Sequence, residues 1–115
     1  SVENVSRVEL AQDANENSET IRNRVVEARA VAAHRFKNEL WSLNSEIPPR
    51  ALRQQYQPER QAMNFLHDEL DKERITARGL HKIIRTSWTI ADLKGVTRPT
   101  LDEVTESYRL REGIE

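Results

Sequence analysis

Three cations repeat along one side of a predicted helix, and their shared chemistry is anion binding. Arg78, Lys82 and Arg85 recur at spacings of four and three residues, which places them on a common face of an α-helix. Arg78 falls in the first turn, where backbone N–H groups are still unpaired and the helix dipole favours negative charge. A guanidinium there suits a phosphate or carboxylate. The alternative is a solvated arginine without a ligand.

The sequence offers little other site chemistry. His34, His67 and His81 fall on different predicted helices, and the chain has no cysteine, so we expect no metal site. No glycine stands in a G-x-x-x-x-G-K-[ST] pattern, so we do not expect this chain alone to be an enzyme that cradles a triphosphate in that way. No Ser-His-Asp or paired-carboxylate arrangement stands out from a background rich in Asp and Glu.

Length and composition predict one soluble helical domain. Of the 115 residues, 37% are hydrophobic and 32% are charged, which fits amphipathic helices around a single modest core. A net charge of −1 gives no general affinity for nucleic acid or an anionic membrane, although it is compatible with a local basic face. No apolar run approaches the roughly 20 residues of a membrane span, and no signal peptide is recognisable. We therefore expect a cytoplasmic protein without membrane association.

The helix that carries the basic face is predicted over residues 77–94. Thr76 can cap its N-terminus, and Gly95 after Lys94 is typical of a helix end. One side is apolar and expected to be buried: Leu80, Ile83, Ile84, Ser87, Trp88 and Ala91. The opposite side is expected to face solvent: Arg78, Lys82, Arg85, Thr89 and Asp92.

A long amphipathic helix is predicted over residues 18–43. Ser18 is a good N-cap, and apolar residues follow at spacings of three and four: Ile21, Val25, Ala28, Ala32, Phe36, Leu40 and Leu43. The other side is mainly basic: Arg22, Arg24, Arg29, Arg35 and Lys37. Glu27 and Glu39 are interleaved with these cations, so we interpret this side as a solvated face with ion pairs between successive turns.

Prolines and capping residues predict the remaining helices. The Pro48-Pro49 pair ends the long helix and starts a short connecting helix, and Pro58 starts a helix that runs to about Asp71. Thr100 and Glu103 form a capping box before a last helix. The predicted fold class is all-α, a small bundle of four main helices plus a short connecting helix.

Two regions are expected along the chain. Residues 1–17 have few strong apolar side chains and no sustained period, so we predict a flexible leader or the end of a preceding domain. Residues 18–113 are predicted to form the helical domain.

Two motifs, in order and at about the right separation, give the chain a family resemblance. The first matches E-x-S-x-x-I-R-x-R-V-x-x-A-R: Glu16, Ser18, Ile21, Arg22, Arg24, Val25, Ala28 and Arg29. The second resembles L-S-A-R-x(4)-I-L-[KR]-x-A-R-T-I-A-D-L-x-G, on residues 75–78, 83–85, 89–93 and 95. Leu43-Asn44 matches an L-N-A element between them. The chain resembles, over nearly all of its length beyond Asn15, the C-terminal lid of magnesium-chelatase-like AAA+ ATPases of the ComM/YifB type.

The resemblance implies a part in an ATPase rather than an activity of this chain alone. It implies that residues 1–17 lead from an AAA+ core, and that Arg78 is the sensor-2 arginine that reaches the γ-phosphate of ATP bound with Mg²⁺ to that core. Other arginines at family positions are candidates for contacts with nucleotide, a neighbouring subunit or acidic groups of the lid: Arg22, Arg24, Arg29 and Arg85. The whole protein is then expected to be a homo-oligomeric ring motor, and in ComM-type members a DNA helicase.

Departures from the family pattern include Thr76 and Trp88. Thr76 replaces the usual Ser and keeps the capping hydroxyl, whereas Trp88 replaces a usual Arg and is expected to be partly buried. At the C-terminus, a gapless alignment places Leu110-Arg111 on the family's Tyr-Arg. The alternative to a lid is an autonomous helical module that binds nucleic acid or an acidic protein through the basic helix face.

Overall fold

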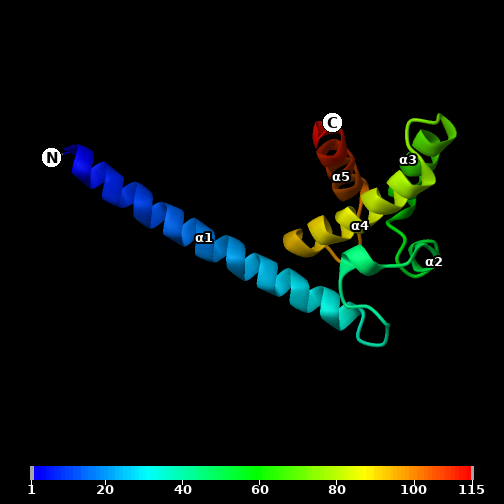
Figure 1. The fold of residues 1–115 in the computed structure, drawn as a ribbon, viewed down its shortest axis with the longest axis horizontal. Helices are drawn as coiled ribbons and strands as arrows, with labels where there is room; N and C mark the ends of the chain where they lie inside the picture. Colours follow the sequence, from blue (N-terminus) through cyan, green and yellow to red (C-terminus); the bar gives the residue numbers. More distant parts are fainter. Residues whose placement is uncertain (1, 115) are drawn as a thin grey trace.

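The chain is all helical over the part that the structure describes, which comprises the backbone of residues 2–114 and the side chains of residues 17–111. In this computed structural model the elements are α1 (Val2–Arg35), a 3-10 turn η1 (Asn44–Glu46), α2 (Pro49–Leu52), α3 (Arg60–Asp71), α4 (Ala77–Lys94) and α5 (Leu101–Ile114). Figure 1 shows α1 as a long arm, while the other elements gather around α4. The predicted all-α class is confirmed.

The central helix of the domain is α4. It contacts each of the other elements, namely α1, η1, α2, α3 and α5. All six residues predicted for its apolar face are buried: Leu80, Ile83, Ile84, Ser87, Trp88 and Ala91. Full burial of one large aliphatic side chain contributes about 1.5–3 kcal/mol, so this face supplies much of the stability of the bundle.

Both ends of α4 lie where local sequence chemistry places them. The Thr76 hydroxyl oxygen accepts a hydrogen bond from the Gly79 N–H at 3.1 Å, which satisfies one of the free donors of the first turn. At the other end Gly95 takes a left-handed conformation with φ 77°, and the Val96 N–H donates to the Ala91 carbonyl at 2.8 Å. The predicted bounds of this helix are confirmed.

The N-terminal end of α1 differs from the prediction. The helix begins at Val2, so Ser18 lies inside it and does not cap it. Neither Pro nor Gly occurs between Val2 and Arg35, so nothing in the sequence interrupts the helix. The leader predicted over residues 1–17 includes the start of α1, and the side chains of residues 1–16 lie outside the described residues.

The C-terminal end of α1 also differs, because the helix stops at Arg35 and not near Leu43. The chain turns there and returns the Trp41 ring to the Phe36 ring, with 5.7 Å between their centroids. On a continuous helix, two residues five apart point in different directions, so this contact requires the turn. Leu40 and Leu43, predicted for the apolar stripe, are instead 103% and 47% exposed.

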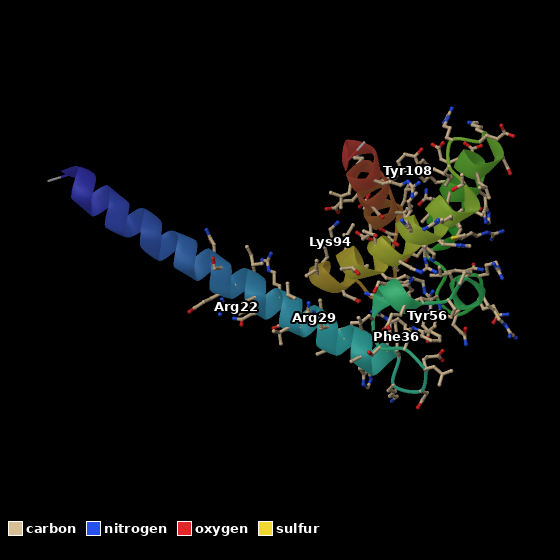
Figure 2. All side chains as sticks on the ribbon, viewed as in Figure 1. Arg22, Arg29, Phe36, Tyr56, Lys94 and Tyr108 are labelled. Atoms are coloured by element: carbon tan, nitrogen blue, oxygen red, sulfur yellow. The ribbon has the colours of Figure 1, made fainter. Side chains whose placement is uncertain are left out.

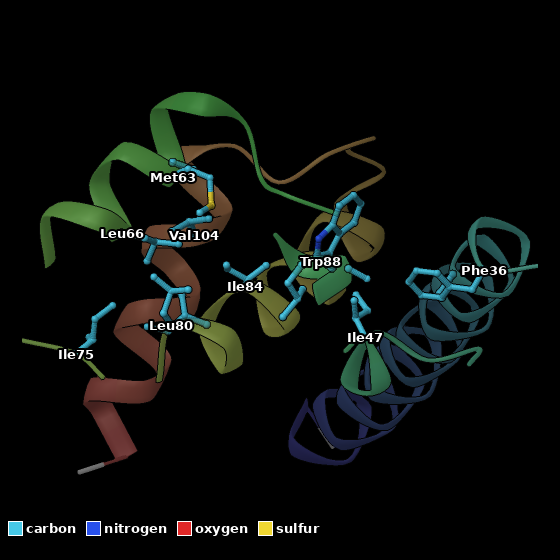
Figure 3. Close-up of a cluster of buried hydrophobic side chains, with 14 residues drawn as sticks. Phe36, Ile47, Met63, Leu66, Ile75, Leu80, Ile84, Trp88 and Val104 are labelled. Carbon is cyan, nitrogen blue, oxygen red and sulfur yellow. The ribbon is translucent and has the colours of Figure 1, made fainter. Parts of the chain in front are cut away.

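One apolar core connects α1 to the helices around α4 (Figure 3). Its buried members come from α1 to α5 and from the segments that join them: Ala32, Phe36, Ile47, Ala51, Leu52, Ala62, Met63, Leu66, Ile75, Leu80, Ile83, Ile84, Trp88 and Val104. Trp88, predicted to be partly buried, is only 2% exposed, and its indole N–H donates to the Tyr56 carbonyl at 2.8 Å. This hydrogen bond removes the cost of burying the indole donor.

The shorter elements follow the predicted start signals. Pro49 is the first residue of α2, and α3 begins two residues after Pro58. The Glu103 carboxylate accepts from the Thr100 N–H at 2.8 Å, as a capping box requires, while the Thr100 hydroxyl oxygen accepts from the Asp102 N–H at 3.2 Å. The turn η1 was not predicted. In the described part of the chain, no helix is both long and apolar enough to cross a membrane.

Replacing Thr76 by Ala should destabilise the domain, because the first turn of α4 loses its side-chain acceptor. We expect the free energy of unfolding to fall by about 1 kcal/mol, measured by urea denaturation. Thr86→Ala is the matched control, since Thr86 is exposed in the interior of the same helix. The capping role is wrong if both variants have the same stability.

Stability should also fall in acid through Glu103. Burial acts to raise its pKa, but hydrogen bonds from the Thr100 side chain and backbone, with the Lys94 ammonium, outweigh burial and lower the pKa below its ordinary 4.5. A carboxyl with a lowered folded-state pKa stabilises the fold above its unfolded value and loses this contribution as pH falls through the folded value. Urea unfolding between pH 7 and pH 3 should therefore show a weaker acid dependence in Glu103→Gln. Glu106→Gln, which removes the exposed partner of the same lysine, should retain more of it.

Candidate functional site

Arg78 is held at the surface by the structure around it. It is the second residue of α4 and is exposed, and the apolar face of the same helix is fixed in the core. Among the described residues it has neither a hydrogen bond nor an ion pair. The backbone at Arg78 is fixed by the capped helix, and its unpaired guanidinium is available to an anion brought by another domain or molecule.

A second arginine lies beside the same helical turn. The Arg111 guanidinium of α5 packs over Gly79, with Nη2 3.0 Å from the place that a Cβ at Gly79 would take. Glycine therefore allows α5 to bring this cation against the first turn of α4. In the gapless alignment, Arg111 corresponds to the arginine of the family's Tyr-Arg pair.

The basic face predicted for α4 is not continuous in the structure. Lys82 is exposed, as expected, but Arg85 is only partly exposed. Its Nε–H donates to the Ile47 carbonyl at 2.8 Å, so this guanidinium helps to fix the segment between η1 and α2. The prediction that Arg85 faces solvent is therefore wrong in part, because its Nε–H is hydrogen-bonded within the fold.

Sequence reasoning missed a buried polar cluster formed by Arg35, Asn44 and Asp92. Arg35 Nη1 donates to Asn44 Oδ1 and to Asp92 Oδ2, each at 3.1 Å, while Nη2 pairs with Asp92 Oδ1. Asn44 Nδ2 donates to Asp92 Oδ2 at 2.9 Å and to the Thr89 hydroxyl at 3.3 Å. The cluster connects the last residue of α1, the first residue of η1 and the C-terminal part of α4.

The indole ring of Trp88 packs against the guanidinium of this cluster. The Arg35 guanidinium carbon lies 4.4 Å from the centroid of the Trp88 ring, a cation–π contact at a site where little water remains. The side chains of Arg35 and Asp92 are 14% and 1% exposed. Trp88 therefore does more than fill the core, because its face supports the cation that pairs with Asp92.

Two expectations about charge are corrected by this cluster. Arg35 was predicted on a solvated face of the first helix and Asp92 on the solvent side of the helix 77–94, yet both are turned inward. Helical periodicity assigns charged residues to the surface by default, and a pair separated by 57 positions leaves no local signal. A signal was present in the Leu43-Asn44 and Thr89-Ile90-Ala91-Asp92-Leu93 motifs, whose polar members meet here.

The three arginines of the first motif lie along α1 and are exposed (Figure 2 labels Arg22 and Arg29). Arg22 has Glu19 three residues before it, and Arg24 has Glu27 three residues after it, so each has a carboxylate within reach on its own helix. Arg29 has none at these spacings. The predicted pairing between turns is therefore available to Arg22 and Arg24 but not to Arg29.

The three histidines do not converge. His67 and His81 line one mainly apolar cavity of about 450 Å³ between α2, α3 and α4, while His34 lies by a different cavity at the end of α1. Burial, followed by the charges of Arg85 and Arg53, lowers the pKa of His81, which favours its neutral form. Within residues 17–111, no group of three or more His, Asp or Glu side chains is arranged to hold a metal ion.

The fold and this geometry define a small helical domain that presents a free arginine at the start of its central helix and holds its first helix through a buried ion pair. The chain belongs to the family described as magnesium chelatase, subunit ChlI C-terminal, whose model matches residues 15–111. The family predicted from the two motifs is thus confirmed.

Relatives at the sequence level come from mycobacteria. An uncharacterized protein of Mycobacterium bovis is 34% identical over 97 residues, and uncharacterized proteins from two strains of Mycobacterium tuberculosis give the same identity. The match covers 84% of this chain and 19% of each relative, so the chain spans about a fifth of their length. No solved structure matches the chain.

Removing the carboxylate of Asp92 should strongly destabilise the domain. Asp92→Ala leaves the Arg35 guanidinium largely buried without its anion, so we expect a loss of about 3–5 kcal/mol in the free energy of unfolding. The matched control is Asp68→Ala, which removes an exposed ion pair with Lys72 and should cost less than about 1 kcal/mol. Equal losses in the two variants would contradict the proposed weight of the buried pair.

Proposed function

We propose that this chain is the C-terminal lid of a magnesium-chelatase-related AAA+ ATPase and supplies Arg78 to ATP bound by the core of that protein. The observation that carries the proposal is the free, exposed guanidinium at the start of a helix whose position is otherwise fully determined. Family membership over residues 15–111 supports the lid assignment. ATP and Mg²⁺ would be bound mainly outside this chain.

The side chain of Arg78 fits a terminal phosphate. A guanidinium offers a planar fork of N–H donors that matches phosphate oxygens, and each charge-assisted hydrogen bond contributes about 1.5–3 kcal/mol. The Thr76 cap fixes the first turn of α4, so the guanidinium starts from a defined backbone position. The contact would exist only while the terminal phosphate is present, which gives two nucleotide states with different lid contacts.

Movement of the lid would then follow from loss of this contact. The buried pair of Arg35 and Asp92 joins α4 to α1, so a change in the position of α4 would carry α1 with it. Such a rigid connection converts a local contact at Arg78 into displacement of a long helix. We propose that this displacement couples ATP hydrolysis to motion in a cytoplasmic homo-oligomeric ring.

The arginines of α1 and the substrate of the motor belong to the same proposal. Arg22 and Arg24 are exposed on the long arm, where they would meet a neighbouring subunit, and Arg85 would act within the lid. The resemblance to ComM-type members extends the proposal to DNA as the substrate of the full-length ring. The engagement of Arg85 inside the fold disfavours the alternative of an autonomous module that binds through a continuous basic face.

Replacing Arg78 by Ala in the full-length protein should impair ATP turnover or its coupling to assembly. Loss of one charge-assisted contact of about 1.5–3 kcal/mol corresponds to a decrease of roughly 10- to 150-fold in kcat/KM for ATP. Steady-state hydrolysis and ATP-dependent assembly are the measurements. Lys82→Ala is the control, because it removes an exposed cation one turn further along α4. Unchanged turnover together with unchanged assembly in Arg78→Ala would sink the proposal.

A further inference from the structure

The Arg111 guanidinium of α5 lies flat against the first turn of α4. Its Nη2, Cζ and Nη1 atoms are 3.0, 3.1 and 3.1 Å from the place that a Cβ at Gly79 would take. Because the three atoms are at nearly equal distances, the plane of the guanidinium faces the helix. The Nη–H donors lie in that plane, so they point along the surface of α4 and are not directed at its backbone.

The backbone position of Arg111 is set one turn earlier on α5. There the Ser107 hydroxyl donates to the Ile83 carbonyl at 2.8 Å, and Ser107 is only 2% exposed. Arg111 follows Ser107 by four residues, and Gly79 precedes Ile83 by four, so the two contacts are successive steps along antiparallel helices. Arg111 therefore belongs to the side of α5 that packs on α4.

Arg111 is a cation on a packed helix side that lacks a partner within residues 17–111. It is only partly exposed, and its guanidinium has neither a hydrogen bond nor an ion pair with a described residue. Cations that are withdrawn from water are ordinarily paired. Glu103, on the same packed side of α5, follows this rule through its ion pair with Lys94 at 3.2 Å. The unpaired Arg111 indicates an anion that comes from outside this part of the chain.

Arg78 and Arg111 meet the same turn of α4 from two directions. Gly79 directly follows Arg78, so their Cα atoms are about 3.8 Å apart, and successive residues of a helix point about 100° apart. Arg78 is exposed and its long side chain is not held by a described partner. Both guanidiniums can therefore reach one anion. Like charges at one turn repel each other, and an anion between them replaces this repulsion by two attractions.

We propose that Arg111 is a second ligand of the terminal phosphate of ATP, together with Arg78. This rests on the proposed function, namely that Arg78 meets that phosphate. Two planar forks of N–H donors suit a phosphate group with several charged oxygens better than one fork does. Gly79 is the residue that allows this arrangement, because a side chain there would take the place of the Arg111 guanidinium.

Nucleotide affinity of the full-length protein tests the role of Arg111. Isothermal titration calorimetry compares ADP with AMP-PNP, an ATP analogue that resists hydrolysis. Arg111→Ala should weaken AMP-PNP binding by about tenfold or more, through loss of one charge-assisted hydrogen bond, and should leave ADP within about twofold. Arg109→Ala is the matched control, since it removes an exposed arginine two positions earlier on α5, and both affinities should stay within about twofold.

Two results of this titration would overturn the inference. If Arg111→Ala weakened ADP and AMP-PNP equally, Arg111 would act on the fold of the lid or on another part of the nucleotide. If it changed neither affinity, Arg111 would not meet the nucleotide.

Gly79→Ala supplies a second arm that keeps the charge of Arg111. The new Cβ would lie 3.0 to 3.1 Å from the guanidinium, closer than an ordinary contact, so the guanidinium must shift. Alanine is also the better helix former, so the lid should stay folded. We expect AMP-PNP to bind about threefold more weakly, because a small misplacement already weakens a directed contact. In an Arg111→Ala background, Gly79→Ala should cause no further loss. The same effect with and without Arg111 would contradict the proposed contact.

The outcome is separable from that of the nucleotide role of Arg78. A selective loss of AMP-PNP affinity in Arg78→Ala, with unchanged affinities in Arg111→Ala, would support the proposed function and remove this inference. A selective loss in Arg111→Ala alone would keep Arg111 as a phosphate ligand and remove the role of Arg78.

Discussion

The buried ion pair between Arg35 and Asp92 fixes how the first helix of this domain meets its central helix. Bringing two charges out of water is costly, and a pair of this kind persists only when its remaining hydrogen-bonding groups are satisfied. Here Asn44 both accepts from Arg35 and donates to Asp92, and the face of Trp88 supports the guanidinium. The helix α1 stops at Arg35, and the residues that follow it bring Asn44 to this pair and the Trp41 ring to Phe36.

The central helix, α4, connects two surfaces of different chemistry. At its start, Arg78 is exposed and the Arg111 guanidinium packs over Gly79, and at its far end the polar cluster meets α1. Between them the apolar face is buried in a close-packed core, which transmits displacement and does not absorb it. This arrangement suits a part that responds to nucleotide at its Arg78 end, as proposed for the lid.

Much of the fold could be predicted because its signals are local. The Thr76 cap, the left-handed Gly95 and the box of Thr100 with Glu103 each act within one turn, so their sequence patterns determined helix ends that the structure confirms. Pro49 and Pro58 likewise predicted the starts of α2 and α3. The apolar face of α4 was also correct in every position, since a strict helical period with large aliphatic residues leaves one face to bury. Binding of a phosphate by Arg78 stays a prediction, because the nucleotide would be bound by another part of the protein.

The sequence by itself therefore predicted the main helices apart from the ends of α1, together with the apolar face of α4, because these depend on residues only a few positions apart. It also predicted the family, through two motifs. Tertiary structure decided the rest. Arg35 and Asp92 are 57 positions apart in the sequence, so their charges became interior only because the fold brings them together, and the turn after Arg35 brings the Trp41 ring to the Phe36 ring. Periodicity assigns charge to solvent, and only the assembled fold decides which charges find a partner that makes burial favourable.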